Sequence, residues 1–343
     1  MSLRPSPLDD LLPKRTGSLP DVAVIGAGLS GVTAARALRA AGYPVTVFEK
    51  SRGPGGRMAT RRTETGDTFD HGAQYFTARD ALFLEQVRWW MDAGVVAEWH
   101  GVIGTLEHGR VTRSEREQVR YVGVPSMGSG VREYAETLHT RYEVRVERVE
   151  REGSAWRLTT ESGERLGPFD VVVVAVPAPQ AVPLLAGAPE LAARAATVNM
   201  EPCQAVMARF EARVTLELDG AFVHDSPLSW IARDASKPGR AEGERWVLHG
   251  SPEASREYLE SAPVVVAARW VESFAQATGL EVRPVETVVH RWRYALPSPA
   301  LEETALFDAS MGIGACGDWC GGPRVEGAFL SGVALARRLA SVL

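Results

Sequence analysis

The stretch Asp21-Val22-Ala23-Val24-Ile25-Gly26-Ala27-Gly28-Leu29-Ser30-Gly31 decides the fold. Its apolar start, residues 21–25, predicts a buried strand, residues 30–41 predict a helix, and residues 44–49 predict a second strand. The pattern G-x-G-x-x-G lies between the first strand and the helix. Its first glycine permits a tight turn, its second lets backbone approach a pyrophosphate, and its third lets helix and strand pack closely. These elements predict the first half of a Rossmann unit.

A second loop follows the second predicted strand and favours FAD over NAD. Glu49 ends that strand, where an acid can bond ribose hydroxyls. Gly55 and Gly56 let the loop fold over a dinucleotide, and Arg57 offers paired N–H donors to pyrophosphate oxygens. Because an NAD site does not usually need this second clamp, the combination indicates FAD.

A third motif lies near the end of the chain, where residues 312–317 form a short apolar run that ends at Gly317-Asp318. An aspartate at this position suits a bond to a ribityl hydroxyl. The glycine-rich turn that follows predicts a helix over residues 326–343. A helix N-terminus aimed at the flavin would stabilise negative charge that develops there on reduction.

Composition excludes several classes of function. The chain has 343 residues, a net charge of −5 and 45% hydrophobic residues, so it is long enough for two domains and has no electrostatic footprint for nucleic acid or an anionic membrane. Three cysteines argue against a disulfide framework, and a metal site at Cys316 and Cys320 is disfavoured without a nearby histidine. No signal peptide or membrane span is expected, which makes the cytoplasm the default location.

These motifs together resemble the flavin-containing amine oxidase superfamily, and within it the renalase-like branch. Features of that branch are Phe69-Asp70-His71-Gly72-Ala73-Gln74-Tyr75-Phe76-Thr77, residues 228–233 with Ser236-Lys237-Pro238-Gly239, and His290-Arg291-Trp292-Arg293-Tyr294. The resemblance covers nearly the whole chain after Leu19. With the motifs above, it implies these FAD-binding residues: Gly26, Ala27, Gly28, Leu29, Ser30, Gly31, Glu49, Lys50, Gly55, Gly56, Arg57, Met58, Ala73, Gln74, Val144, Gly317, Asp318, Val325 and Glu326.

The resemblance also implies an α/β, two-domain fold of the hydroxybenzoate-hydroxylase and amine-oxidase type. A Rossmann-like FAD domain would be joined to a substrate domain with a mixed, mainly antiparallel sheet. We expect residues 1–19 to be a disordered lead-in. Residues 20–80, 118–182 and 300–343 would form a discontinuous FAD-binding domain, and residues 81–117 and 183–299 the substrate domain.

For chemistry, the resemblance implies an oxidase that takes hydride from dihydronicotinamide isomers and passes electrons to O2. Gln74 and Lys237 are the candidate catalytic residues, although Lys237 sits in a Lys-Pro-Gly turn and the flavin would carry the chemistry. Candidate pocket residues are Tyr75, Trp230, His249, Trp292, Arg293 and Tyr294, with His71 and Arg291 as weaker candidates. Cys320 lies in no motif for covalent attachment, so we expect non-covalent FAD.

Three alternatives remain open at this point. The chain could be an amine oxidase or desaturase acting on another small substrate, a flavin-binding protein without turnover, or a plain NAD-dependent dehydrogenase. The expected partner is a small-molecule substrate. It would be a dihydronicotinamide nucleotide for the renalase-like oxidase, or an amine for the amine oxidase.

Overall fold

The computed structural model describes residues 5–107, 109–114 and 118–342. Its first sheet has the strand order β19-β20-β13-β1-β2-β9, parallel except for the pair β19 and β20. The strands are β1 Val22–Ile25, β2 Val45–Phe48, β9 His139–Arg141, β13 Val171–Val174, β19 Leu306–Asp308 and β20 Ile313–Ala315. A parallel sheet is buried on both faces, and here successive residues of β1 and β13 pack into opposite clusters.

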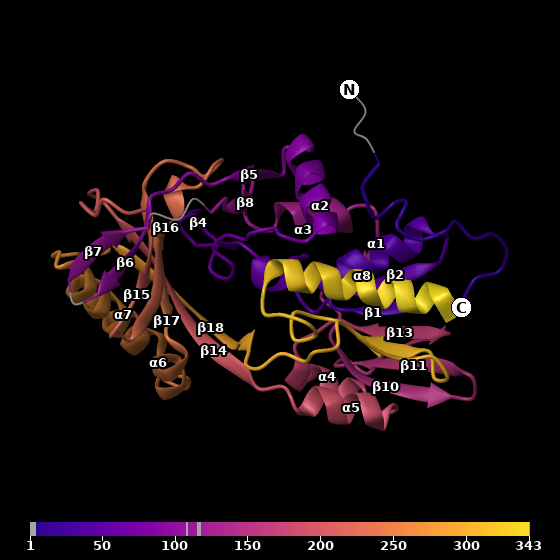
Figure 1. Cartoon of the computed structure of the whole chain (residues 1–343). Helices are drawn as coiled ribbons and strands as arrows, with labels where there is room; N and C mark the ends of the chain where they lie inside the picture. The colour runs from indigo at the N-terminus through magenta and orange to yellow at the C-terminus, as the bar shows by residue number, and fades with distance from the viewer. Residues whose placement is uncertain (1–4, 108, 115–117, 343) are drawn as a thin grey trace.

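Helices cover one face of this sheet and a small sheet covers the other (Figure 1). The first face packs against α1 Leu29–Ala40, α2 Ala81–Asp92, α3 Ser129–Ala135 and α8 Val325–Val342. The second face packs against the antiparallel strands β10 Val146–Glu152, β11 Ala155–Thr160 and β12 Arg165–Phe169, with α4 Ala178–Leu184 and α5 Pro189–Ala196. This layering brings the ends of β1, β2 and β20 to one edge.

A second sheet of seven strands, in the order β18-β14-β17-β16-β15-β6-β7, makes the other half of the molecule. Its strands are β6 Ile103–Glu107, β7 Arg110–Arg113, β14 Met200–Phe210, β15 Gly220–Val223, β16 Leu228–Arg233, β17 Glu244–Gly250 and β18 Glu286–Pro297. Neighbouring strands are antiparallel except β15 and β6. One face packs on α7 Pro263–Thr278 and α6 Pro252–Glu257, and the other turns toward the first half.

Short elements connect these parts. They are β3 Arg61–Arg62 with β4 Thr68–Phe69, β5 Val96–Glu98 with β8 Tyr121–Gly123, and 3-10 turns at Gly56–Met58 and Asp234–Ser236. Among the described helices, none has both the length and the hydropathy that crossing a bilayer requires.

The fold class predicted from sequence is confirmed, and most predicted elements lie where expected. One helix ends earlier than its local periodicity indicates: α3 ends at Ala135, and residues 139–141 form edge strand β9 beside β2. Hydrogen bonding to the exposed edge of β2 explains this difference, since local periodicity cannot report a strand partner 93 residues away.

The expected lead-in is wrong for the described residues 5–19, because this segment packs against α1, α2 and α3. Leu8 is 0% exposed and Leu12 is 7% exposed in the main cluster. Ser6 contacts Gln86 and Tyr134, and Asp9 pairs with Arg36 at 3.0 Å. Residues 1–4 lie outside the described part of the chain. Leu8 and Leu12 anchor a segment whose prolines and charges resemble a loose tail.

Two of the domain boundaries predicted from sequence differ from those in the structure. Helix α2 was assigned to the substrate domain, but its Phe83 and Trp90 pack against Phe329 of α8, at 5.1 and 6.5 Å between ring centres. Helix α5 was assigned there too, yet it packs under the first sheet. The chain therefore enters the seven-stranded sheet at β6 and again at β14, and we place the domain boundaries at these strands.

Candidate FAD and substrate site

The two glycine loops predicted to bind FAD lie against each other. Gly28 and Gly55 form a bridge, and the Gly55 amide donates to the Ala27 carbonyl at 2.9 Å. Gly26 has a φ of +107°, which a side chain would strain. A Cβ on Gly31 would lie 2.1 Å from the Gly26 carbonyl oxygen. The close contact of strand, turn and helix therefore requires these glycines.

Glu49 organises the same turn through its carboxylate. It accepts hydrogen bonds from the amides of Ala27 and Ser51, each at 2.8 Å, and is 7% exposed. The Val144 amide donates to the Glu49 carbonyl at 2.9 Å, which brings the predicted Val144 to this edge, although it precedes β10 and lies outside that strand. Lys50, also predicted, is exposed.

The end of the chain returns to this edge. Arg57 forms a two-point ion pair with Asp318, at 2.7 and 2.6 Å, and donates to the Ala295 carbonyl at 3.0 Å. The Gly317 amide donates to the Ser331 hydroxyl at 3.0 Å, which ties the turn after β20 to α8. Two residues predicted to hold different parts of FAD, separated by 261 positions, thus contact each other directly.

The predicted flavin-side residues also converge. The Ala73 amide donates to the Arg57 carbonyl at 2.9 Å, and a Cβ on Gly72 would meet that carbonyl oxygen at 2.1 Å. Glu326, in the first turn of α8, accepts from the amides of Arg79 and Asp80 at 2.6 and 2.8 Å. The remaining predicted residues, Leu29, Ser30, Met58 and Val325, lie in or beside these turns.

This arrangement fits a dinucleotide. A Cβ added at Gly28 meets no described atom within 4 Å, so open space lies over the first turn of α1. Among the described residues no side chain caps α1, which leaves its first N–H groups for a phosphate. Arg57 follows Gly56, which lies against Gly28. Its guanidinium fork is bound to Asp318, so bidentate contact with phosphate oxygens would require Arg57 to exchange that partner.

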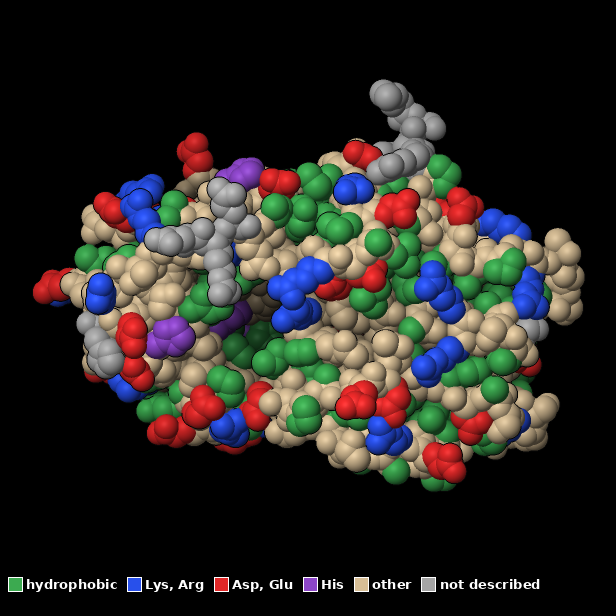
Figure 2. All heavy atoms as spheres, viewed as in Figure 1, with side chains coloured by type: hydrophobic (Ala, Val, Ile, Leu, Met, Phe, Trp, Pro, Cys, Tyr) green, Lys and Arg blue, Asp and Glu red, His purple; other side chains and the backbone are tan. Residues whose placement is uncertain are grey.

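A cavity of about 350 Å³ opens beside the Gly72–Tyr75 segment. It is lined by Gly72, Ala73, Gln74, Tyr75, Phe222, Ser229, Trp230 and His249. Tyr75 and Trp230 are neighbouring aromatic walls, 5.5 Å apart. Figure 2 shows a hollow where the two halves meet, with histidine and hydrophobic side chains in it and cationic side chains at its edge. The lining combines the rings of Tyr75, Phe222, Trp230 and His249 with small or polar uncharged residues.

The predicted residues on β18 divide between two faces. The Trp292 indole N–H donates to the His71 carbonyl at 2.9 Å, and its ring stacks on His71 behind the cavity wall. Arg293 instead pairs with Glu260 at 2.6 and 3.0 Å, as does Arg291 at 2.8 Å. Tyr294 packs against the cluster under the first sheet. Because strand residues alternate between faces, Trp292 and Arg293 cannot line one cavity, and this placement departs from the predicted pocket.

Three neutral histidines back the cavity. Burial, reinforced for His71 by His290 and Arg61, lowers the pKa of His71 to about 3. Burial also lowers the pKa of His249 to about 4, and of His290 to about 4. The His249 Nε2 lies 3.2 Å from the His71 carbonyl oxygen, which can only accept, so Nε2 carries the proton. Nδ1 of His249 is then an acceptor.

The comparisons with known proteins agree with this site. Residues 24–85 match the NAD(P)-binding Rossmann-like domain, and residues 105–340 match the family described as flavin containing amine oxidoreductase. The second match covers more than half of the chain. The chain belongs to the flavin-containing amine oxidoreductase family. It is an FAD-dependent oxidoreductase enzyme with a flavin cofactor.

Individual relatives match over shorter stretches. An L-amino-acid oxidase of Daboia russelii is 47% identical over 49 residues, which cover 14% of this chain and 10% of the relative. A 4,4'-diapophytoene desaturase of Staphylococcus haemolyticus is 49% identical over 51 residues, 15% of this chain and 10% of the relative. Flavin-containing monooxygenase ustF2 of Aspergillus flavus is 27% identical over 199 residues, which cover 45% of this chain and 40% of the relative. The chain thus spans less than half the length of these relatives.

Solved structures of the family share the fold across nearly the whole chain. One, named "Putative protoporphyrinogen oxidase" from Exiguobacterium sp. 255-15, has a TM-score of 0.77 at 14% identity and covers 95% of this chain and 100% of its own. Wild-type putrescine oxidase bound to putrescine has a TM-score of 0.71 at 16% identity. The match covers 94% of this chain and 99% of the putrescine oxidase chain. At these identities the likeness shows the fold alone.

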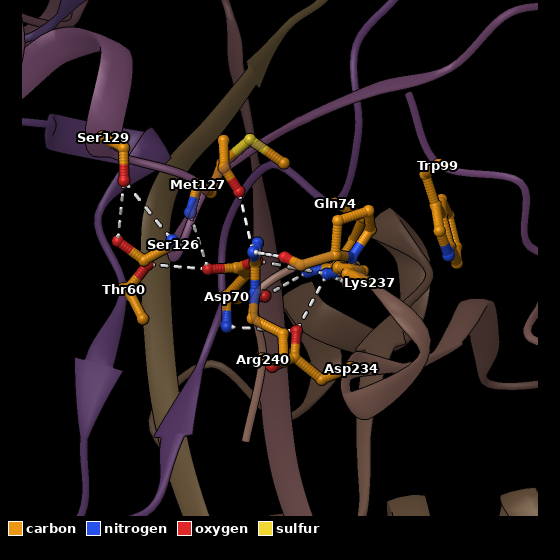
Figure 3. A network of polar contacts seen from close by, with 12 residues as sticks. Thr60, Asp70, Gln74, Trp99, Ser126, Met127, Ser129, Asp234, Lys237 and Arg240 are labelled. Atoms are coloured by element: carbon orange, nitrogen blue, oxygen red, sulfur yellow. Dashed lines mark hydrogen bonds and ion pairs between the residues drawn. The ribbon is translucent and has the colours of Figure 1, made fainter. Parts of the chain in front are cut away.

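Lys237, the candidate catalytic lysine, lies in a buried charge network, which we define as Asp70, Asp234, Lys237 and Arg240 (Figure 3). Burial pushes the pKa of Asp70 up, but Lys237 and Arg240 outweigh it and hold that pKa at about 2. Burial raises the pKa of Asp234 against the opposing effect of Lys237. The network joins the segment before the cavity to the turn after β16.

Sequence reasoning missed several of these residues. Phe222 and Ser229 line the cavity, and Asp234 and Arg240 belong to the buried charge network. Asp70 was quoted only as part of a motif. One signal was available for the network, since Asp234, Lys237 and Arg240 fall within seven positions of one short turn. Phe222 carried no signal, because no motif was recognised on its strand, whereas Ser229 lay within the quoted motif of residues 228–233 but was not singled out.

Proposed function

We propose that this protein is a renalase-like oxidase that takes hydride from dihydronicotinamide isomers and uses O2 as the electron acceptor. The observation that carries the proposal is the cavity beside the Gly72–Tyr75 segment. Its lining is aromatic and uncharged, and it adjoins the residues expected to hold FAD. FAD, when bound, supplies the hydride acceptor and the later transfer of electrons.

The cavity residues can hold a flat, uncharged ring. Tyr75 and Trp230 contact each other and provide a continuous aromatic surface on one side of the space. A dihydropyridine gives up hydride readily because aromaticity returns, so no catalytic base is required. His249 offers an acceptor at the wall for an N–H group such as a carboxamide.

Charge near the cavity also favours a nucleotide over a cationic amine. The guanidinium of Arg120 lies 5.3 Å from the centre of the Tyr75 ring. A fixed cation there repels an ammonium group and attracts a phosphate. A dihydronicotinamide nucleotide combines the uncharged ring with the anionic tail that this arrangement suits.

The test is anaerobic mixing of the yellow holoenzyme with equilibrated dihydronicotinamide isomers, following oxidised-flavin absorbance near roughly 450 nm, a wavelength set by the cofactor. We expect fast bleaching by the minor isomers and slow bleaching by ordinary NADH. Readmitted oxygen should restore the absorbance and yield peroxide. A flavin that stays oxidised with every isomer would overturn the proposal.

An amine oxidase with a small substrate is the second candidate, and the paired aromatic walls favour it. The rings of Tyr75 and Trp230 contact each other and together offer one aromatic surface, on which a neutral amine could pack as well as a ring. A panel of primary and secondary amines in the same anaerobic experiment distinguishes the two. Bleaching by an amine, with none by the dihydronicotinamides, would establish the second candidate.

We further propose that FAD is bound non-covalently. Burial raises the pKa of the Cys316 thiol to about 12 and raises the pKa of Cys320 above its usual range. Thiols held protonated in the core are poor nucleophiles for attachment to a flavin. Acid precipitation should therefore release all of the yellow colour into the supernatant, and colour retained in the pellet would contradict the proposal.

A further inference from the structure

The side chain of Lys237 is 0% exposed, and each of its three donors has a partner (Figure 3). Its Nζ lies 2.8 Å from Asp234 Oδ1, 3.1 Å from Gln74 Oε1 and 3.4 Å from Asp70 Oδ2. An ammonium group has three protons to donate. Lys237 therefore has no donor left for a molecule in the cavity.

Gln74 is fully bonded as well. Its Oε1 accepts from Lys237, while its Nε2 donates to the Gly72 carbonyl at 3.1 Å and to the Asp70 carbonyl. The amide can face only one way, because the cation requires the oxygen and the two carbonyls require the nitrogen. Gln74 thereby closes the 70–74 segment into a fixed turn that forms one wall of the cavity.

The contact between Lys237 and Gln74 crosses 163 positions of sequence and joins the two halves of the molecule. Lys237 follows β16 of the seven-stranded sheet, whereas Gln74 belongs to the segment beside Arg57. Asp70 and Asp234 hold the ammonium group in place, and Arg240 balances Asp70 from the other side. The network is thus a buried support that contacts the cavity-lining side chain of Gln74 through the ammonium group of Lys237.

We propose that Lys237 is a positioning residue that acts through Gln74: it fixes the Gly72–Tyr75 wall against the second sheet and contacts neither cofactor nor substrate. The inference rests on the proposed function in one respect, that this cavity is the substrate site. It deepens that function, since it assigns the fixed position of one cavity wall to a contact between the two halves of the chain.

The experiment is a double-mutant cycle in the holoenzyme with Lys237→Met, Gln74→Leu and the double variant. For each we would measure FAD affinity, the visible flavin spectrum, and kcat and KM for the dihydronicotinamide isomers. We expect each single change to shift the flavin spectrum and to lower kcat/KM about tenfold, chiefly through KM. The double variant should match the single variants within about twofold, because residues that act as one unit are non-additive.

Multiplied losses in the double variant, or a loss in kcat alone that is specific to Lys237→Met, would overturn the proposal in favour of a direct role. Lys237→Met leaves two buried carboxylates with one fewer cation and can fail to fold, so Gln74→Leu, which removes no charge, keeps the test decisive. An unchanged spectrum and unchanged kinetics in Gln74→Leu would then refute it.

Lys14→Met is the matched control, because Lys14 is an exposed lysine whose ammonium group donates to the carbonyls of Asp9 and Ala40. It should leave every readout as in the wild type. If the wild type oxidises no dihydronicotinamide, the proposed function fails by itself. FAD affinity and the flavin spectrum still decide the positioning role in that case.

Discussion

The FAD-binding loops and the wall of the substrate cavity are built by different means. In the loops, backbone approaches backbone: Gly28 meets Gly55, and Gly31 lies against the Gly26 carbonyl. In the wall, buried charges from distant segments meet, as Asp70 does with Lys237 and Arg240. The first construction tolerates almost no added atom, and the second tolerates almost no lost charge.

This difference teaches where each part of the molecule is vulnerable. A glycine loop is encoded in a few adjacent residues and fails by steric clash. The charge network depends on the pairing of Asp70 with residues more than 160 positions away, and it fails by desolvation of an unpaired ion. The predictions below test this contrast from the largest expected effect to the smallest.

Asp70→Asn should have the largest effect. Asp70 is 0% exposed, pairs with Lys237 and Arg240, and accepts from Thr60 and the Met127 amide. Removing its charge leaves two buried cations undercompensated, which costs about 3–5 kcal/mol for a broken buried pair. Urea unfolding measures the loss. A loss below about 1 kcal/mol would mean that water or neighbouring groups already screen these charges.

A pair of glycine changes should separate folding from cofactor binding. Gly31→Ala should destabilise the protein by about 2–3 kcal/mol even without FAD, because its Cβ would lie 2.1 Å from the Gly26 oxygen. Gly28→Ala should leave the unfolding of the FAD-free protein unchanged, since its Cβ meets no described atom within 4 Å, yet weaken FAD binding at least about tenfold.

Thermal unfolding with and without FAD, together with FAD titration, checks both glycine variants. Gly53→Ala is the control, because a Cβ there also meets no described atom within 4 Å and Gly53 lies outside the predicted contacts. Equal loss of FAD affinity in Gly28→Ala and Gly53→Ala would remove the special role of Gly28.

Acid should weaken the cavity side through its buried histidines. The folded pKa of His71 is about 3, below the ordinary value of 6.5. The unfolded chain therefore binds more protons between these values, and stability falls as pH falls from 6.5 toward 3. We expect His71 alone to contribute a loss of about 2 kcal/mol between pH 7 and 5.

Urea unfolding at pH 7 and pH 5 measures this dependence in the wild type and in His71→Gln. The variant is expected to be less stable at both values but to lose less between them. An identical pH dependence in both proteins would show that His71 does not carry the effect.

Arg293→Gln should have the smallest effect. Its ion pair with Glu260 is exposed, and exposed pairs contribute little. KM for the dihydronicotinamides should change by less than about twofold, whereas Trp292→Leu, on the opposite face of β18, should raise it more. A large rise in KM for Arg293→Gln would return this arginine to the substrate site, where the sequence had placed it.

The sequence predicted the cofactor edge well because that edge is local. The run from Asp21 to Gly31 contains strand, turn and helix in eleven residues, and Gly317-Asp318 carries its own turn. Periodicity and glycine chemistry suffice where partners are close in the chain.

The cavity could be predicted only in part. Tyr75, Trp230 and His249 were candidates and do line it, but Arg293 lies on the other face of its strand. Strand alternation leaves two choices of inward face, and only pairing with β14 decides between them. The burial of Lys237 could not be predicted either, because a Lys-Pro-Gly turn is typical of an exposed loop.

The strand order of the first sheet has a consequence for how the protein is made. Strand β20, residues 313–315, pairs with β13, residues 171–174, and α8 then closes over α1. The chain up to residue 315 must therefore be synthesised before the first sheet gains its last parallel strand. Until then, strands β1, β2 and β13 form a partial sheet in which the edge of β13 has unpaired backbone N–H and C=O groups. Such an edge is a binding site for chaperones. Capture of the cofactor therefore has to follow the synthesis of β20 and α8, which complete this edge of the sheet.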